Sequence, residues 1–224
     1  MGSFKLLAVV LLHCNKNSMM TTALQPSDNG YTSAMQTSAD ETSCTDKAAV
    51  IYTSEITTPL GPMLAGTTAR GVCLLEFTNR IRLEKEFSDL QKILDAVMMP
   101  GKNQYSDQLE KELNEYFAGK RKAFSVPLHT PGNEFSQSVW KTLQKIPYGK
   151  TCSYKEQAEM MNNPKAIRAI AATNGRNRVA IIIPCHRVIG SDGSMTGYAA
   201  GVERKKWLLN FERNNSETAA GYLF

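Results

Sequence analysis

The sequence reads VAIIIPCHR at residues 179–187, an apolar and mostly β-branched run that leads into Pro184, Cys185, His186 and Arg187. A short apolar run of this kind is typical of a buried strand, which places Cys185 at the strand's end. The thiolate is the reactive form of cysteine, and a neighbouring imidazole accepts protons near neutral pH. The stretch therefore indicates a nucleophilic cysteine, although an inert buried cysteine fits these residues alone equally well.

The composition indicates a globular protein with one basic half. The chain has 224 residues, enough for one or two domains, with 42% hydrophobic residues, 21% charged residues and a net charge of +5. Residues 131–212 carry 12 Lys and Arg against 6 Asp and Glu, so the rest of the chain has a net charge of about −1. This local excess favours an anionic partner such as nucleic acid, with a merely solvent-exposed basic face as the alternative.

The cysteines indicate a reduced protein without a zinc site. There are five of them, an odd number, and no CxxC or Cys/His spacing resembles a set of metal ligands. We therefore expect free thiols, an intracellular protein and no bound metal.

The first 46 residues predict a disordered extension. They are rich in Ser and Thr and poor in large apolar side chains, so they bury too little surface to offset the entropy of ordering. The apolar run at residues 6–12 is similar to a signal-peptide core, but a poor cleavage site follows it and it is too short to span a membrane. We treat the extension as dispensable, with organelle targeting or secretion as the alternative.

Residues 47–126 predict a small α/β domain. β-Branched runs and Pro/Gly turns favour an antiparallel sheet, and apolar residues at helical spacing favour two helices. His129 follows in a Pro-flanked loop where we expect a surface position without partners. The expected elements are strands at 50–53 and 72–78, a turn at 58–62, and helices at 81–97 and 107–118.

Residues 127–214 predict a mostly helical second domain, followed by a tail at 215–224. An apolar stripe from Phe135 to Leu143 indicates a core helix, and Ser153 with Glu156 has the pattern of a capping box. A break at Asn162-Asn163-Pro164 separates that short helix from another at 165–173. Two short helices around a tight break are similar to a helix-turn-helix.

The helix at 165–173 is rich in alanine and carries the single Arg168. Small side chains allow a helix backbone to approach another surface closely. Tight packing inside the core and contact with DNA both fit this pattern, and the residues alone leave the two open.

These motifs together resemble the O6-alkylguanine-DNA alkyltransferases, also called methylated-DNA–protein-cysteine methyltransferases. The resemblance covers residues 135–212 closely, and residues 48–120 resemble the family's smaller N-terminal domain. It implies an α+β fold, with a small N-terminal domain of antiparallel sheet and helices and a mostly helical C-terminal domain that contains a helix-turn-helix. The matching motifs are Ser153-Tyr154, Pro164-Lys165-Ala166 with Arg168, Asn174-Gly175-Arg176-Asn177, Ile183-Pro184-Cys185-His186-Arg187-Val188-Ile189-Gly190, Thr196-Gly197-Tyr198-Ala199, and Glu203-Arg204-Lys205 with Trp207-Leu208-Leu209 and Glu212.

The resemblance implies a single alkyl transfer without any cofactor. Cys185 attacks the alkyl carbon on O6 of guanine and keeps the group as a stable thioether. Glu212 orients His186, which takes the cysteine proton through a water, as in a nucleophile–base–carboxylate triad. Asn177 supports the active-site turn, and Tyr154 donates a proton to N3 of the departing guanine.

The resemblance also assigns the base pocket and the DNA surface. The carbonyls of Cys185 and Val188 accept from the exocyclic amine of the base, the amide of Ala199 donates to O6, and Tyr154, Tyr198 and Ala200 line the pocket. The helix at 165–173 enters the minor groove, and Arg168 takes the place of the base that has left the stack. The residues expected to bind DNA are Ser153, Tyr154, Lys165, Ala166, Arg168, Ala169, Arg176 and Arg187.

Two positions depart from the family's pattern, and zinc ligands found in some animal members are not evident. Ala200 replaces a usual Gly, so its methyl group is expected to narrow the pocket or strain the backbone. Arg178 replaces a common Pro, which loosens the turn or adds a phosphate contact.

The expected partner is double-stranded DNA that carries O6-alkylguanine, and the sequence leaves open whether O4-alkylthymine is a further substrate. We expect a monomer that does not bind membranes and that acts in the nucleus of a eukaryote or the cytoplasm of a prokaryote. The main alternative is an alkyltransferase-like protein that binds the lesion without accepting its alkyl group; Cys185 argues against it. A thiol hydrolase and a plain helix-turn-helix regulator leave more of the motifs unexplained.

Overall fold

The computed structural model describes residues 49–195 and 197–216. The predicted extension, its signal-like run, Thr196 and most of the predicted tail therefore lie outside the described residues. Within the described part, no helix is both long and apolar enough to cross a bilayer.

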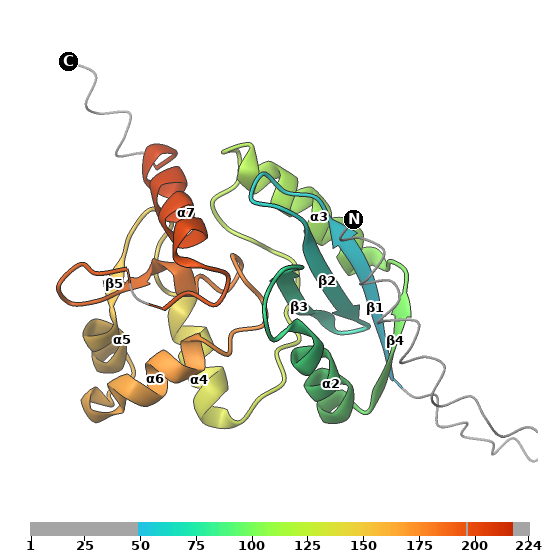
Figure 1. Ribbon diagram of the computed structural model, residues 1–224, viewed down its shortest axis with the longest axis horizontal. Helices are drawn as coiled ribbons and strands as arrows, with labels where there is room; N and C mark the ends of the chain where they lie inside the picture. Colours follow the sequence, from blue (N-terminus) through green and yellow to red (C-terminus); the bar gives the residue numbers. More distant parts are fainter. Residues whose placement is uncertain (1–48, 196, 217–224) are drawn as a thin grey trace, which may run out of the picture. The chain divides into compact units, whose positions relative to one another are not determined.

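The N-terminal half is built on a four-stranded sheet in the order β3-β2-β1-β4 (Figure 1). Strands β1 (Ala49–Ile56), β2 (Met63–Thr68) and β3 (Gly71–Phe77) pair antiparallel. β1 and β3 confirm the strands expected at 50–53 and 72–78, and the expected turn follows β1, whereas β2 was not predicted. Every residue of β2 and β3 is buried, because these strands are covered on both faces.

A fourth strand, β4 (Ala96–Pro100), pairs parallel to β1, so the sheet is mixed and the purely antiparallel prediction is corrected. The predicted helix at 81–97 is the shorter α2 (Leu83–Leu94). It ends because Asp95 takes a left-handed backbone conformation with φ of 45°, after which the chain enters β4.

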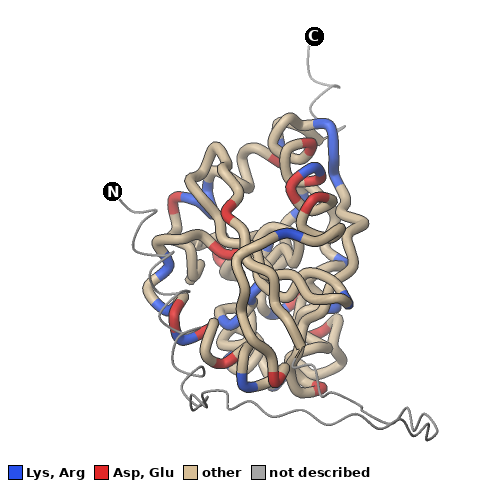
Figure 2. Tube along the Cα trace, turned by 90° about the vertical axis from the view of Figure 1, so that its right-hand side faces the viewer, with Lys and Arg blue, Asp and Glu red and all other residues tan. Residues whose placement is uncertain are grey.

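Helix α3 (Gln104–Phe117) packs against β2 and β3. Asn103 caps its N-terminus in a reciprocal pair with Ser106, so it begins before the predicted residue 107. Its buried face carries Leu109, Leu113 and Tyr116. Seen from the right-hand side of Figure 1, basic and acidic residues intermingle along the chain (Figure 2).

The C-terminal half is mostly helical, as predicted. Helix α4 (Glu134–Leu143) carries the predicted apolar stripe, and the Ser153–Glu156 capping box begins α5 (Tyr154–Met160). The predicted helix at 165–173 is a 3₁₀ turn at Pro164–Ala166 followed by α6 (Ile167–Asn174), which packs against α5. Helix α7 (Val202–Asn214) and the two-residue strands β5 (Cys152–Ser153) and β6 (Val188–Ile189), which pair in parallel, complete this half.

The apolar run at 179–183 is not a strand, which corrects the prediction. Val179 forms one isolated bridge with Leu75, and the amide of Ala180 donates to the carbonyl of Leu75 over 2.8 Å. Beyond this point the run coils, with φ of 72° at Ile181, and Cys185–Arg187 form a 3₁₀ turn. An all-apolar run indicates burial, but without alternation it does not distinguish a strand from a buried coil.

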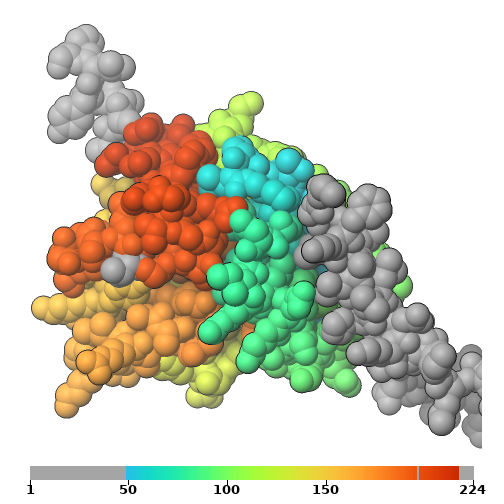
Figure 3. Space-filling view, in the orientation of Figure 1, coloured from blue at the N-terminus to red at the C-terminus, as the bar shows by residue number. Residues whose placement is uncertain are grey.

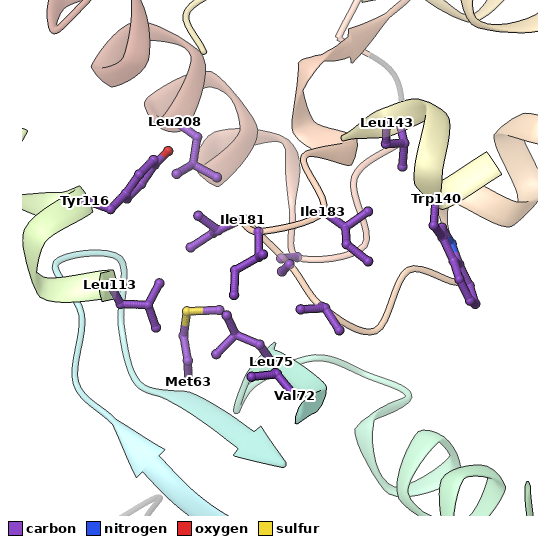
Figure 4. Packing of buried hydrophobic residues seen from close by; sticks show 14 of the residues in the cluster. Met63, Val72, Leu75, Leu113, Tyr116, Trp140, Leu143, Ile181, Ile183 and Leu208 are labelled. Carbon is purple, nitrogen blue, oxygen red and sulfur yellow. The ribbon is translucent and has the colours of Figure 1, made fainter. Parts of the chain in front are cut away.

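This coil fills the core between the two halves. Ile181 and Ile183 are both 1% exposed. Figure 4 shows their side chains between Leu75 and Met63 on one side and Leu143 on the other. The run that leads to Cys185 is thus held by packing from both halves rather than by strand pairing.

The segment that connects the two halves, which includes Pro127 and His129, runs along the edge of β3. The amide of Val72 donates to the carbonyl of Pro127 over 2.8 Å, and the amide of His129 donates back to Val72 over 2.8 Å. The ring of His129 shares a 2.9 Å hydrogen bond with the hydroxyl of Thr68, so the expectation that it has no partner is wrong.

A substitution at Gly71 tests this close approach. Its φ is +134°, and a Cβ atom there would lie 2.3 Å from the carbonyl oxygen of Pro127. We expect Gly71→Ala to lower the free energy of unfolding by about 3 kcal/mol, measured by urea denaturation. Gly193→Ala is the control, because Gly193 has φ of +79° with nothing within 4 Å and should cost about 1 kcal/mol. Equal losses of unfolding free energy in the two variants would show that a side chain at position 71 does not clash with the segment around Pro127.

Candidate active site

The carboxylate of Glu212 is the centre of a buried polar cluster. Glu212 lies on α7 and is fully buried, as is His186. Oε1 accepts from Tyr116 Oη at 2.8 Å and lies 2.9 Å from His186 Nε2. Oε2 accepts from Arg187 Nε at 2.9 Å and from the amide of Gly149 at 3.1 Å, and a second Arg187 nitrogen donates to Oε1 at 3.0 Å. Both oxygens are therefore satisfied by donors from three other segments of the chain.

These contacts hold Glu212 ionised. Burial by itself raises the pKa of Glu212, but the hydrogen bonds and charges of His186 and Arg187 outweigh it and hold that pKa well below its usual range. Since a carboxylate only accepts hydrogen bonds, Nε2 of His186 carries the proton in this contact.

His186 is a neutral imidazole at pH 7. Burial lowers the pKa of His186 from 6.5, although the hydrogen bond and charge of Glu212 oppose the shift. With Nε2 protonated, the lone pair of Nδ1 is available to accept a proton. A neutral ring fixed in one tautomer by a carboxylate is the arrangement of a general base.

Arg187 is part of this cluster and not of an open surface. It is 7% exposed and donates to the carbonyl of Ile146 at 2.6 Å as well as to Glu212. Its guanidinium lies 5.7 Å from the centre of the Tyr148 ring. The expectation that Arg187 binds DNA is therefore wrong, because its charge neutralises a buried carboxylate.

Cys185 is half-buried and lies at the start of the 3₁₀ turn. Asn177 is 2% exposed, and its side-chain amide donates to Cys185 Sγ at 3.2 Å and to the carbonyl of Ile183 at 2.8 Å. Burial raises the pKa of Cys185 to about 11, against the lowering effect of Asn177. The thiol is protonated at neutral pH, so its reaction requires a proton acceptor.

Two tyrosines lie close to this thiol. Burial raises the pKa of Tyr154 and of Tyr198, and in both the charge of the Cys185 thiolate adds to the rise. The Tyr198 ring is 6.5 Å from the His186 ring, edge to face. Both tyrosines therefore remain protonated and able to donate.

A cavity of about 770 Å³ opens beside these groups. It lies between the two halves: the C-terminal half contributes Tyr154, Arg168, Tyr198 and Ala199, and the loop from β3 to α2 contributes residues 80–82. Figure 3 shows the green surface of the N-terminal half in contact with the orange surface of the C-terminal half. Its volume is in the usual range for small-ligand pockets.

The residues predicted to bind DNA, apart from Arg187, lie at or near the surface. Lys165, Arg168, Ala169 and Arg176 are exposed, whereas Ser153, Tyr154 and Ala166 are half-buried. Four of the seven, Lys165, Ala166, Arg168 and Ala169, come from the 3₁₀ turn and α6.

The departures from the family's pattern do not strain the backbone as expected. Ala200 is 8% exposed and is not among the described residues with positive φ, whereas its neighbour Gly201 has φ of 97°. Arg178 donates to the carbonyl of Pro131 at 3.4 Å, which ties the turn to the connection between the halves.

Sequence reasoning missed two polar residues of the site. Tyr116 binds Glu212 from the other half, 96 positions earlier in the chain, and no pattern links the two. Lys205 is fully buried and donates to the carbonyl of Val188 at 2.6 Å. It lies in the Glu203-Arg204-Lys205 motif, but nothing in that motif indicates burial. Among residues 49–195 and 197–216, no group of three or more His, Cys, Asp or Glu side chains is arranged to hold a metal ion.

The fold and this cluster define a two-part α+β protein with a Cys–His–Glu site, and comparison with known proteins identifies the family. Residues 51–130 match the ribonuclease-like domain of 6-O-methylguanine DNA methyltransferase, and residues 134–214 match its DNA binding domain. The chain therefore belongs to the 6-O-methylguanine DNA methyltransferase family.

Relatives and solved structures agree with this assignment. A methylated-DNA–protein-cysteine methyltransferase of Methanosarcina barkeri is 40% identical over 168 residues, which cover 74% of this chain and 99% of the relative. The crystal structure of a Mycobacterium tuberculosis O6-methylguanine methyltransferase is 34% identical, with a TM-score of 0.63 over 79% of this chain and 99% of that one. A structure of Mycobacterium tuberculosis OGT in complex with DNA is 36% identical, with a TM-score of 0.62 over 75% and 94% of the two chains.

A substitution that removes the buried charge of Glu212 tests the polar cluster around it. We expect Glu212→Gln to lower the free energy of unfolding at pH 7 by about 3 kcal/mol, because it leaves Arg187 buried without its carboxylate. Because the pKa of Glu212 is lower in the folded state than its usual value of 4.5, the ionised carboxylate stabilises the fold at pH values above 4.5. This stabilisation is lost as the pH falls through the pKa of Glu212 in the folded state. The deficit should therefore shrink in denaturant titrations below about pH 4.5.

Glu203→Gln on the same helix is the control, since this side chain is 87% exposed and should leave stability unchanged at every pH. A deficit for Glu212→Gln that is as large at pH 3 as at pH 7 would contradict an ionised Glu212.

Proposed function

We propose that this protein repairs DNA by irreversible transfer of the alkyl group from O6-alkylguanine to Cys185. One observation carries the proposal: Asn177 holds the sulfur of a half-buried cysteine, and the next residue is a neutral histidine whose proton position is set by Glu212. Membership in the methyltransferase family supports alkyl transfer over other thiol chemistry.

The reaction divides into one proton removal and one displacement. His186 accepts the thiol proton at Nδ1 through a water, and Glu212 stabilises the imidazolium that results. The sulfur then forms a bond to the alkyl carbon while the bond from that carbon to O6 breaks. Tyr154 donates its hydroxyl proton to N3 of the departing guanine, so that guanine leaves neutral. Proton return from His186 to Tyr154 restores both groups, but Cys185 remains a thioether.

The cavity beside Tyr154 and Tyr198 is the place for the flipped base. The carbonyls of Cys185 and Val188 accept from its exocyclic amine, and the amide of Ala199 donates to O6. A carbonyl oxygen has two lone pairs, so the bond from Lys205 to Val188 leaves one for the base. Ala200, which is buried at the edge of this loop, narrows the range of alkyl groups accepted.

Helix α6 is the element that meets duplex DNA in this proposal. Its exposed alanines permit close approach to the minor groove, and Arg168 lies both on its exposed face and at the cavity. Arg168 fills the place of the extruded base, while Lys165, Arg176 and Ser153 contact the backbone. Because these contacts are to phosphates, binding weakens as salt rises. The protein acts as a monomer, inside the cell where its DNA substrate lies.

A lesion-binding protein without transfer is the second candidate function. It requires no acceptor thiol, and here the thiol is held by Asn177 with its base one residue away. We therefore favour transfer.

Intact mass spectrometry tests the transfer directly. After incubation with duplex DNA that carries O6-methylguanine, we expect one methylene unit to be added per protein, on the Cys185 peptide. Cys185→Ala should add nothing and still bind the DNA. A protein that binds the lesion but gains no mass would support the lesion-binding alternative.

The role of Arg168 is tested by comparing two substrates. Arg168→Ala should slow repair of duplex O6-methylguanine by about 100-fold, because the extruded base is no longer replaced in the stack. Its rate with the free base O6-benzylguanine should stay within about twofold of the wild type, because no base has to be flipped. Lys141→Ala, a change at an exposed residue of α4, should leave both rates unchanged. Equal losses on the two substrates would reject a flipping role for Arg168.

A further inference from the structure

Arg80, in the loop between β3 and α2, is a buried arginine that joins the two halves at the active site. Its side chain is 5% exposed. It forms ion pairs with Glu76 on β3 and, at 2.7 Å, with Glu86 on α2. The side chains of these two glutamates are 3% and 12% exposed. The N-terminal half thus fixes the position of this guanidinium with the carboxyl groups of two glutamates. Burial raises the pKa of Glu76 to about 8 and also raises that of Glu86, while the charge of Arg80 opposes both shifts.

The same guanidinium donates to the turn that follows α6. One terminal nitrogen binds the carbonyl of Asn177 at 3.1 Å, and the other binds the carbonyl of Gly175 at 3.0 Å. Each terminal nitrogen thus makes one contact to a carboxyl group and one to a backbone carbonyl. A guanidinium has several donors in one plane, as this arrangement needs, whereas a lysine ammonium concentrates its charge and donors at a single nitrogen.

The turn held by Arg80 carries the side chain that holds the acceptor sulfur. Asn177 donates to Cys185 Sγ and to the carbonyl of Ile183, and its own oxygen accepts from the amide of Val179 at 3.0 Å. A shift of this backbone moves the donor away from the sulfur. The hydrogen bond from Asn177 lowers the pKa of Cys185, so its loss makes the thiolate harder to form.

We propose that Arg80 is a positioning residue for alkyl transfer: it anchors the Gly175–Asn177 turn to the N-terminal half and thereby keeps the Asn177 amide on the Cys185 sulfur. The N-terminal half, which carries none of the groups that react, then sets the reactivity of the thiol. The inference rests on the proposed role of Cys185 as alkyl acceptor.

The alternative is that Arg80 only braces the two halves. Arg204 offers a matched comparison, because it also joins them: it donates from α7 to the carbonyl of Leu60 at 3.1 Å and to Asn79 at 3.0 Å. None of the hydrogen bonds from Arg204 reaches the Gly175–Asn177 turn. A bracing role predicts the same behaviour for both arginines, whereas positioning predicts an effect on the thiol from Arg80 alone.

The test measures the rate at which iodoacetamide alkylates Cys185 between pH 6 and pH 10, followed by mass spectrometry of the Cys185 peptide. Arg80→Lys and Arg80→Gln should both lower the rate about tenfold throughout this pH range, because the range lies below the pKa of Cys185 and that pKa moves upward by about one unit. Arg204→Lys should leave the profile unchanged even where it lowers stability. Urea denaturation of every variant shows how much stability each one loses.

Two results would overturn the inference. Unchanged profiles in both Arg80 variants would leave only a bracing role. A lower rate in Arg80→Gln but not in Arg80→Lys would show that charge near the sulfur matters and that the position of the turn does not.

Glu86→Gln keeps the inference falsifiable if the Arg80 variants do not fold, because it removes one anchor and leaves the arginine in place. It should lower the rate by a smaller factor, and an unchanged profile would overturn the proposal. Because iodoacetamide reads the thiol itself, the outcome is independent of the assay with methylated DNA. A wild-type protein that fails to accept a methyl group refutes the proposed function and leaves this measurement interpretable.

Discussion

The ionised carboxylate of Glu212 is the constraint on which the rest of the structure depends. A buried charge is tolerated only where it is neutralised and hydrogen-bonded. Here α7 supplies the carboxylate, α3 supplies Tyr116, the loop before β5 supplies the amide of Gly149, and the 3₁₀ turn supplies His186 and Arg187. The requirement to satisfy one carboxylate therefore fixes three distant segments around the Cys185–Arg187 turn, here called the reactive loop. The same contacts fix the tautomer of His186.

The reactive loop is held from two sides. Glu212 fixes it on the side of α7, and Arg80 fixes the Asn177 turn on the side of the sheet. Between them, the coil at 179–183 is buried in the core that both halves share. This explains why an N-terminal half without reacting groups is part of the site. A sulfur that attacks a single carbon atom needs a fixed backbone, because a small shift in its position slows the reaction strongly.

Much of this architecture was predictable from local sequence patterns. The Ser153–Glu156 capping box, the apolar stripe of α4 and the Pro/Gly turn after β1 act within a few residues, and the structure confirms them. Strand β4 was not predictable, because the helical spacing of apolar residues continues through Val97. The coil at 179–183 looked like a strand because burial on all sides removes the alternation that marks one. Arg187 looked like a DNA contact because its partner Glu212 lies 25 positions away, and no periodicity reveals such a pair.

The protonation state of His186 tests the account most directly, and NMR of the protein labelled with ¹⁵N at histidine measures it. We expect a neutral ring with the proton on Nε2 at pH 7 and above, because burial lowers the pKa of His186 and the carboxylate of Glu212 holds the Nε2 proton. An imidazolium at neutral pH, or a neutral ring with the proton on Nδ1, would contradict it, because neither form can take the proton of Cys185.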